Sequence, residues 1–214
     1  KPLWDWKAPA QNDAMVAAVT AAAGGPLAAA YQLRSKQARQ QALGELHRPL
    51  IVMTPKSMLR NKLAVSDPSD FTHGSWKPVL ADPTIEDPGQ VSSVLLCSGK
   101  IRWDLLNARR QAGKDGQVAI LAVERLYPLA AKDIAKQLRR FDRVKEVRWV
   151  QDEPANQGPW PFVALNLPQR LAELEPNRTW RLTKVTRPES SAPSVGSATV
   201  HLQQQRALME AALA

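Results

Sequence analysis

The segment QDEPANQG, residues 151–158, brings carboxylate and amide side chains together in one short stretch. It follows the β-rich run EVRWV at 146–150, which is typical of a strand. Open α/β sheets place ligands and contacts beyond the carboxyl ends of their strands. The alternative is a strand-to-helix turn in which these side chains only cap the helix. We expect a subunit or domain interface, stiffened by Pro154 and Pro161, with these contact residues: Asp152, Glu153, Asn156, Gln157 and Trp160.

Other residues that could do chemistry lack the neighbours that each reaction needs. The turn at 98–100 follows a strand and opens a helix, but it lacks the glycines of a phosphate-binding loop. Cys97 has no histidine near it in sequence to activate it, which predicts a buried structural thiol. The three histidines, His47, His73 and His201, are far apart in sequence and are predicted to be surface or capping residues. We therefore assign no catalytic residue to this chain.

The order of apolar and amphipathic segments predicts an α/β domain. Strands are expected at 50–54, 93–97, 118–123, 146–150 and 180–185. Helices are expected at 15–23, 27–46, 56–60, 100–112, 130–140, 162–174 and 198–213. The stretch 61–90 contains three Asp-Pro pairs and reads as a loop. Strands that alternate with helices predict a mostly parallel five-stranded sheet covered by helices on both faces.

The last predicted helix has a defined start and an apolar contact face. Ser197 is a suitable N-cap, since its hydroxyl can accept a hydrogen bond from the first turn. The residues expected to pack on the domain are Val200, Leu208, Met209 and Leu213.

Composition narrows the classes of protein and of partner. The 214 residues are 44% hydrophobic, which allows a sizeable core, and no apolar run reaches the length that spans a bilayer. The single cysteine fits a reducing compartment, so we expect a cytoplasmic protein without a membrane partner. The net charge of +9 invites a nucleic-acid interpretation. The basic residues are scattered and no nucleic-acid-binding motif occurs, so a solvated basic surface is favoured.

Four phrases of the sequence together resemble one enzyme family. They are MTPKSMLR at 53–60, CSGK at 97–100, QDEPANQGPW at 151–160 and SSAPSVGSATVHLQQQ at 190–205. In this order they resemble the C-terminal domain of the thiamine-diphosphate-dependent decarboxylase component of 2-oxoglutarate dehydrogenase, over about residues 37–214. The wording PANQG is nearest to the actinobacterial members of that family.

The resemblance implies a fold, an activity and partners. It implies the topology of a transketolase C-terminal domain with one antiparallel edge, formed by residues 48–214 after a divergent segment and helix at 1–47. It implies a part in the oxidative decarboxylation of 2-oxoglutarate in the tricarboxylic acid cycle. Thiamine diphosphate and Mg²⁺ would be held by other domains, because the Gly-Asp-Gly…Asn segment of the family is missing here. The implied partners are those thiamine-binding domains, a second copy in a homodimer and the dihydrolipoyl succinyltransferase component.

The resemblance also implies regulation by acetyl-CoA, which actinobacterial relatives bind at this domain. Its phosphates require basic side chains, for which the candidates are Lys100, Arg109, Arg110 and Arg125. Two other readings stay open at this point. One is a subunit of another thiamine-dependent 2-oxo-acid dehydrogenase or of a transketolase. The other is a stand-alone, non-catalytic binding module that uses the basic surface.

Overall fold

The computed structural model describes residues 55–67 and 77–214 of the chain. The chain divides into two compact units, Lys1–Lys77 and Pro78–Ala214. In the first unit, the helix expected at 56–60 is present as a 3₁₀ helix, η1 (Lys56–Arg60). The strand expected at 50–54, the helices expected at 15–23 and 27–46, His47 and His73 lie outside the described residues. The proposed boundary between residues 47 and 48 therefore stays a prediction.

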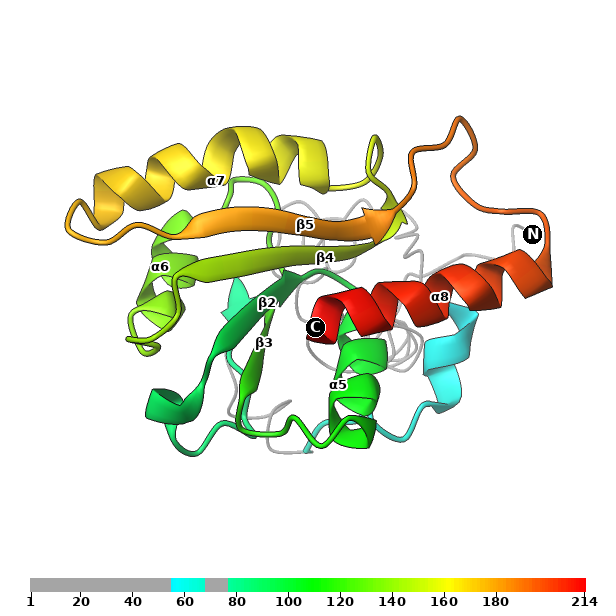
Figure 1. The fold of residues 1–214 in the computed structure, drawn as a ribbon, viewed down its shortest axis with the longest axis horizontal. Coiled ribbons are helices and arrows are strands. Elements are labelled where there is room, and N and C mark those ends of the chain that lie inside the picture. Colours follow the sequence, from blue (N-terminus) through cyan, green and yellow to red (C-terminus); the bar gives the residue numbers. More distant parts are fainter. Residues whose placement is uncertain (1–54, 68–76) are drawn as a thin grey trace, which may run out of the picture. The chain divides into compact units, whose positions relative to one another are not determined.

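The second unit is built on a five-stranded sheet with the order β1-β3-β2-β4-β5 (Figure 1). The strands are β1 (Val79–Leu80), β2 (Ser93–Cys97), β3 (Val118–Val123), β4 (Glu146–Pro154) and β5 (Arg181–Arg187). The pairs β3–β2, β2–β4 and β4–β5 are parallel, and β1 is an antiparallel edge strand on β3. The predicted α/β class and the antiparallel edge are confirmed.

Two details of the sheet differ from the sequence-based expectation. The stretch 61–90 was expected to be a loop throughout, but it contains β1 and a 3₁₀ helix, η2 (Pro88–Gln90). A strand of two residues is too short to show an alternating pattern in the sequence. β1 is defined only by its antiparallel pairing with β3. The strand expected at 146–150 continues to Pro154, because the pairing with β5 resumes there, opposite Arg187, beyond an irregularity after Val150.

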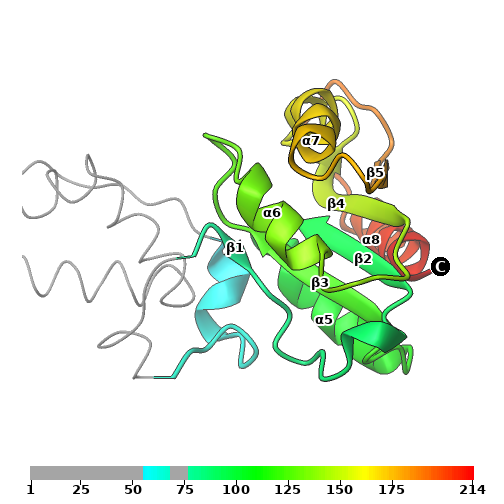
Figure 2. The same ribbon diagram turned by 90° about the vertical axis from the view of Figure 1, so that its left-hand side faces the viewer.

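Four helices cover the two faces of the sheet (Figure 2). They are α5 (Ile101–Gln111), α6 (Ala131–Leu138), α7 (Trp160–Leu174) and α8 (Ala198–Leu213). One apolar cluster joins α6 and α7 to side chains such as Leu96, Leu121 and Trp149. The other cluster joins α5 and α8 to side chains such as Leu95 and Ile120. Neighbouring strand residues thus point to opposite faces, and both faces are buried, as expected for central parallel strands.

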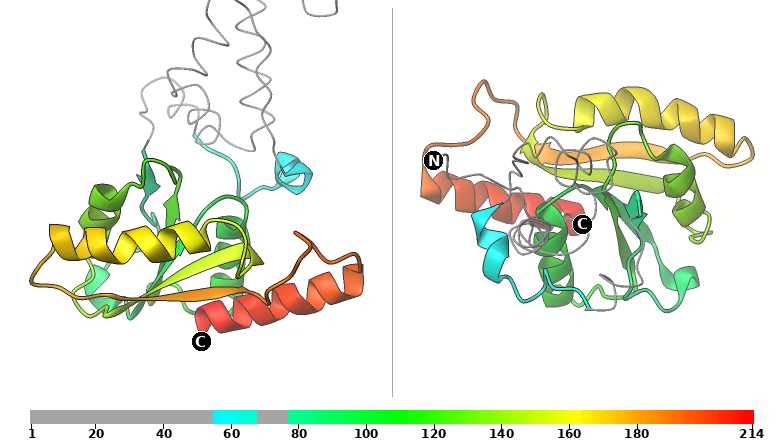
Figure 3. Two further views of the ribbon diagram at one scale, coloured as in Figure 1. Left: turned by 90° about the horizontal axis from the view of Figure 1, so that it is seen from above. Right: turned by 180° about the vertical axis from the view of Figure 1, so that it is seen from behind.

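Helix α8 begins and packs largely as the sequence predicted. The Ser197 hydroxyl accepts a hydrogen bond from the N–H of Val200. Leu208 and Leu213 are buried and Met209 packs against their cluster. Val200 was expected to pack as well but is 39% exposed. The N-terminal half of α8 projects beyond the carboxyl ends of β4 and β5 (Figures 1 and 3). Val200 belongs to the first turn of this half.

We predict that deletion of residues 198–214 destabilises the second unit. The deletion exposes the apolar surface that Leu208, Ala212 and Leu213 cover. It also removes backbone acceptors at the end of α8, where Lys114 donates to Leu213 O and Arg148 donates to Ala212 O at 3.2 Å. Burial of large aliphatic side chains is worth about 1.5–3 kcal/mol each, so a fall in melting temperature of several degrees is expected. An unchanged melting curve would show that α8 is not docked.

Candidate interface at the carboxyl edge of the sheet

Gln151 organises the segment that follows the core of β4. Its side chain is 2% exposed. The amide Nε2 donates to the backbone oxygens of Glu153, Pro154 and Gln157 at 3.3, 3.0 and 2.8 Å. The amide Oε1 accepts from the indole N–H of Trp149 at 3.0 Å and from the backbone N–H of Trp160 at 2.8 Å. One buried side chain therefore fixes the path of residues 152–160. Sequence reasoning placed Gln151 in the segment but did not select it, because an internal role leaves no sequence signature.

Asn156 and Gln157 hold the loop that precedes α8. The Asn156 amide donates to Ser190 O at 2.9 Å and accepts from the Ser190 N–H at 3.1 Å. The Gln157 amide donates to Ser190 O at 2.8 Å and to Ala192 O at 3.3 Å. Both side chains were expected to face a partner, and both also support a neighbouring loop. Asn156 is exposed, so it keeps a face toward solvent.

Asp152 belongs to a charged network that ties β4, β5, α5 and α8 together. It lies 3.2 Å from Lys100 Nζ and 3.7 Å from Arg187 Nη2. Arg187 also donates to Asp152 O at 2.7 Å and to the Gln205 side chain at 2.6 Å. Gln205 in turn donates to Asp104 at 3.2 Å, and Asp104 pairs with Lys100 at 2.7 Å. The network is internally satisfied, so Asp152 acts first as a structural link between elements that are distant in sequence.

Glu153 and Trp160 lie on either side of a tight turn. Gly158 has a φ of +63°, and a Cβ at this position would lie 3.0 Å from the Glu153 side chain. A glycine is therefore required for the turn to pass under Glu153. Glu153 is exposed, while Trp160 is half-buried against the core cluster with Lys184 Nζ 6.0 Å from its ring centroid. Trp160 thus anchors the segment, and Glu153 presents a free carboxylate face to solvent.

An exposed apolar patch adjoins this segment. Tyr127 is 79% exposed and Leu165 is 80% exposed. The ring of Tyr127 lies 6.2 Å from the ring of Phe162 in the first turns of α7. Large apolar side chains exposed together are typical of contact surfaces. Sequence reasoning missed Tyr127 and Leu165, since only the packing of the connection after β3 and of α7 shows which side chains stay exposed.

The four basic residues expected to bind an effector do not share one environment. Arg109 is buried, paired with Asp82, and bonded to Asp115 at 2.8 Å. Lys100 is engaged with carboxylates, and its bond to Asp104 and the Asp152 charge outweigh burial to raise its pKa. Arg110 is exposed at the end of α5. Arg125 follows β3, where it lies 4.0 Å from Asp133. Acetyl-CoA binding by these four stays a prediction.

Cys97 is a buried thiol at the carboxyl end of β2. Its sulfur lies 3.8 Å from Leu121 O, and it is fully enclosed. Burial raises the pKa of the Cys97 thiol to about 12, although the Arg102 charge opposes the shift. The thiolate is therefore not populated near neutral pH, and the sequence-based expectation of a structural thiol is confirmed.

Glu124, just past the end of β3, is the second group at this edge whose pKa is raised by burial. Burial raises the pKa of its carboxyl, and the nearby Arg102 charge only partly opposes this. The folded state therefore favours the protonated form, whose stabilising contribution is complete below the ordinary glutamate pKa and is lost as pH rises through the raised value.

We predict that Glu124→Gln raises the melting temperature at pH 7. The glutamine mimics the protonated carboxyl, so its advantage over the wild type grows as pH rises. Thermal melts of both proteins from acid to neutral pH measure this advantage. The two plots of melting temperature against pH should converge below the ordinary glutamate pKa of 4.5. Exposed Glu86→Gln is a matched control that should shift nothing. A constant offset at all pH values would contradict the assignment.

The described residues do not fit a magnesium–diphosphate site. Among residues 55–67 and 77–214, no group of three or more His, Cys, Asp or Glu side chains is placed to hold a metal ion. His201 is exposed in the first turn of α8, where its backbone oxygen accepts from Arg187 Nη1 at 3.5 Å, as expected of a surface residue. We therefore assign no catalytic step to this part of the chain. In the same described ranges, no helix is long and apolar enough to cross a membrane.

Comparison with known proteins gives a consistent set of relatives. The model of a family described as 2-oxoglutarate dehydrogenase C-terminal matches residues 65–213. The chain is 42% identical over 180 residues to the multifunctional 2-oxoglutarate metabolism enzyme of Mycobacterium sp. (strain KMS), which covers 82% of this chain and 14% of that enzyme. It is 41% identical over 175 residues to the 2-oxoglutarate dehydrogenase E1/E2 component of Corynebacterium glutamicum, which covers 81% of this chain and 14% of that protein. The chain thus spans about one seventh of the length of these relatives.

A solved structure of a split gene transketolase, an inactive beta4 tetramer, is also similar in part. The likeness has a TM-score of 0.41 and 13% sequence identity, and it covers 65% of this chain and 44% of that one. A likeness of this size does not decide function.

Proposed function

Because this chain belongs to the 2-oxoglutarate dehydrogenase C-terminal family, we propose that it is one domain of a larger enzyme that decarboxylates 2-oxoglutarate. In that enzyme the domain packs against the remaining domains and contributes no catalytic residue. The observation that supports this role is the arrangement of residues 151–160, which we call the carboxyl-edge segment. Gln151 holds residues 152–160 from within, while Glu153, Asn156, Tyr127 and Leu165 are exposed.

The wider assignment follows from the family. The remaining domains would hold thiamine diphosphate and Mg²⁺ and perform the chemistry of the tricarboxylic acid cycle step in the cytoplasm. The complete enzyme would be a homodimer that passes its product to a dihydrolipoyl succinyltransferase component. In this proposal the exposed residues Glu153, Asn156, Tyr127 and Leu165 form a carboxyl-edge surface that is part of the domain or dimer contact. A rigid, mixed apolar and polar surface suits a permanent contact of that kind.

A domain replacement tests the proposal. The stretch of the Corynebacterium glutamicum E1/E2 component that matches this chain is exchanged for the chain itself. We expect a chimera that assembles like its parent and decarboxylates 2-oxoglutarate, measured by carbon dioxide release and by mass in solution. A folded chimera without assembly or activity would contradict the proposed role and favour a stand-alone binding module.

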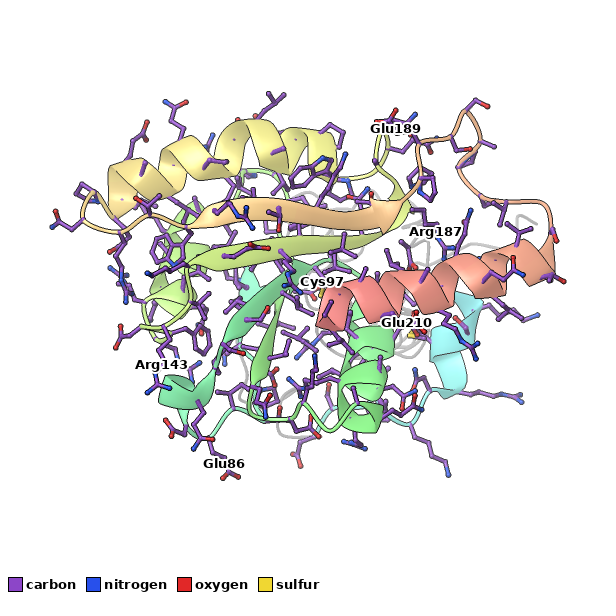
Figure 4. The ribbon with its side chains drawn as sticks, viewed as in Figure 1. Glu86, Cys97, Arg143, Arg187, Glu189 and Glu210 are labelled. Carbon is purple, nitrogen blue, oxygen red and sulfur yellow. The ribbon has the colours of Figure 1, made fainter. Side chains whose placement is uncertain are left out.

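Two substitutions in the chimera test the surface itself. Glu153→Lys and Leu165→Asp alter exposed side chains, so the domain should fold normally. A contact that buries them should weaken by at least about tenfold, which corresponds to about 1.4 kcal/mol. Glu86→Lys is the matched control, since Figure 4 shows Glu86 far from Arg187 and Glu189 at the carboxyl edge. Equal assembly of all three variants would place the contact elsewhere.

A further inference from the structure

Arg102, in the first turn of α5, is a buried cation with an unsatisfied donor. The residue is 8% exposed. Within the described ranges, its Nε is the one buried side-chain nitrogen or oxygen without a hydrogen-bond partner. The guanidinium lies 5.2 Å from the ring centroid of Trp103, an aromatic face that stabilises the cation but accepts no conventional hydrogen bond. Native proteins satisfy nearly all such groups, so an exception calls for a cause.

The position of Arg102 is where open α/β sheets receive ligands. β2 ends at Cys97, and α5 begins four residues later. β3 runs parallel beside β2, with Cys97 opposite Ala122, and Glu124 follows two residues on. The connections after β2 and β3 then lead to helices on opposite faces of the sheet. Strand ends whose connections diverge in this way are the usual place for ligands in open α/β sheets.

The neighbouring cations are paired with carboxylates, whereas Arg102 acts on Glu124 only through its charge and has no ion pair among the described residues. Lys100 pairs with Asp104 and Asp152. Arg109 pairs with Asp82 and Asp115. Removing a guanidinium from water without a hydrogen-bonded anion is strongly unfavourable, whereas a carboxylate or phosphate oxygen offers the planar, charge-assisted acceptor that the group requires.

We propose that Arg102 anchors an oxyanion site at the carboxyl ends of β2 and β3, which takes a carboxylate or a phosphate group. The other groups at this edge suit an incoming anion. The Cys97 thiol stays neutral, because its pKa is raised to about 12. Burial raises the pKa of the Glu124 carboxyl above its ordinary value, so an incoming anion can neutralise this group by protonation more easily than it could an exposed glutamate.

The anion has two possible sources. It is either a small molecule or a carboxylate side chain on another domain or protein that docks here. The inference rests on this chain alone and does not depend on the proposed function.

The first experiment uses the whole chain and added anions. Acetate and inorganic phosphate are titrated at constant ionic strength, with sodium chloride as the balancing salt. Binding is followed by NMR through the side-chain Nε–H resonance of Arg102. A small-molecule source predicts a saturable shift, its loss in Arg102→Met, and binding several-fold tighter in Glu124→Gln. Arg110→Met, an exposed arginine of the same helix, is the control that should retain binding.

Stability distinguishes a binding residue from a structural one. If Arg102 lacks its anion in the isolated chain, Arg102→Met should melt at the same temperature as the wild type or higher, because it removes an unsatisfied buried charge. Added anion should then stabilise the wild type and leave the variant unchanged. A marked fall in melting temperature on substitution, without any anion effect, would show a structural role and overturn the proposal.

The second experiment separates the two sources. If neither free anion binds, Arg102→Met and Arg110→Met are compared in the chimera with the Corynebacterium glutamicum protein. Weaker assembly with Arg102→Met alone would identify a protein carboxylate as the ligand. Normal assembly of both variants, after failure of free anions to bind, would overturn the proposal. A failed chimera with intact anion binding would contradict only the proposed function.

Discussion

Arg109→Met is expected to destabilise the domain by about 3–5 kcal/mol, the effect of breaking a buried ion pair by removing one partner. Arg109 is 1% exposed and pairs with buried Asp82. Its guanidinium also donates to Thr84 Oγ1 at 2.6 Å and to Val118 O at 2.8 Å. Asp82 accepts the N–H of Ile120 at 2.9 Å as well. The arginine therefore joins α5, the 82–84 turn and β3, and its removal leaves buried acceptors unpaired.

Thermal and urea melts measure this effect. A loss of this size should lower the melting temperature by roughly 6 °C or more, since about 2–4 °C accompanies each kcal/mol in a domain of this size. Arg110→Met is the matched control, because the neighbouring arginine is exposed and should change stability by less than about 0.5 kcal/mol. Equal effects at the two positions would contradict the assignment.

The same pair predicts a pH dependence of defined sign. Burial raises the pKa of Asp82, but hydrogen bonds from Thr84, Ile120 and Arg109 outweigh it and hold the pKa below its ordinary value of 3.8. The stability contributed by ionised Asp82 is complete above that ordinary value and is lost as pH falls through the lowered one. Arg109→Met removes part of this lowering, so the stability gap between the two proteins should narrow in acid. A gap that widens in acid would contradict the role of Asp82.

The regular elements of the second unit were predictable because their patterns are long and local. β3 is an uninterrupted apolar run and β2 is apolar after Ser93, as a sheet covered on both faces requires. The α5 and α8 boundaries follow from Gly113, with a φ of +64°, and from the Ser197 cap. Strand β1 was not predictable, since two residues carry no periodicity and only the antiparallel pairing with β3 defines it.

The candidate site was predictable as a segment but not as a set of contacts. The sequence pointed to residues 151–158 because polar side chains follow a strand there. It did not show that Asp152 pairs with Lys100 or that Asn156 holds Ser190, since these partners are distant in the chain. For the same reason, the pairing of Arg109, an effector-binding candidate, with buried Asp82 could not be predicted. Long-range pairing decides which polar residues are free to bind a partner.

Gln151→Met is expected to have the second large effect, on stability and on the carboxyl-edge surface together. Methionine is similar in length but cannot replace the bonds to three backbone oxygens, to the Trp149 indole and to the Trp160 N–H. Each buried polar group left unsatisfied costs about 1–3 kcal/mol, less where the segment relaxes toward water. We expect a loss of about 3 kcal/mol, with release of residues 152–160.

Hydrogen exchange locates this effect and melting curves measure its size. Backbone amides of 152–160 should lose protection in Gln151→Met, while those of β2 and β3 keep theirs apart from the global decrease. Gln169→Met is the matched control, because Gln169 is exposed and bonds only Glu173 at 2.9 Å among the described residues. Unchanged protection at 152–160 would show that the segment is held by its own prolines and by Trp160. Loss of that protection together with weaker assembly of the chimera would instead show that Gln151 prepares the contact surface, because the substitution leaves every outward-facing side chain in place.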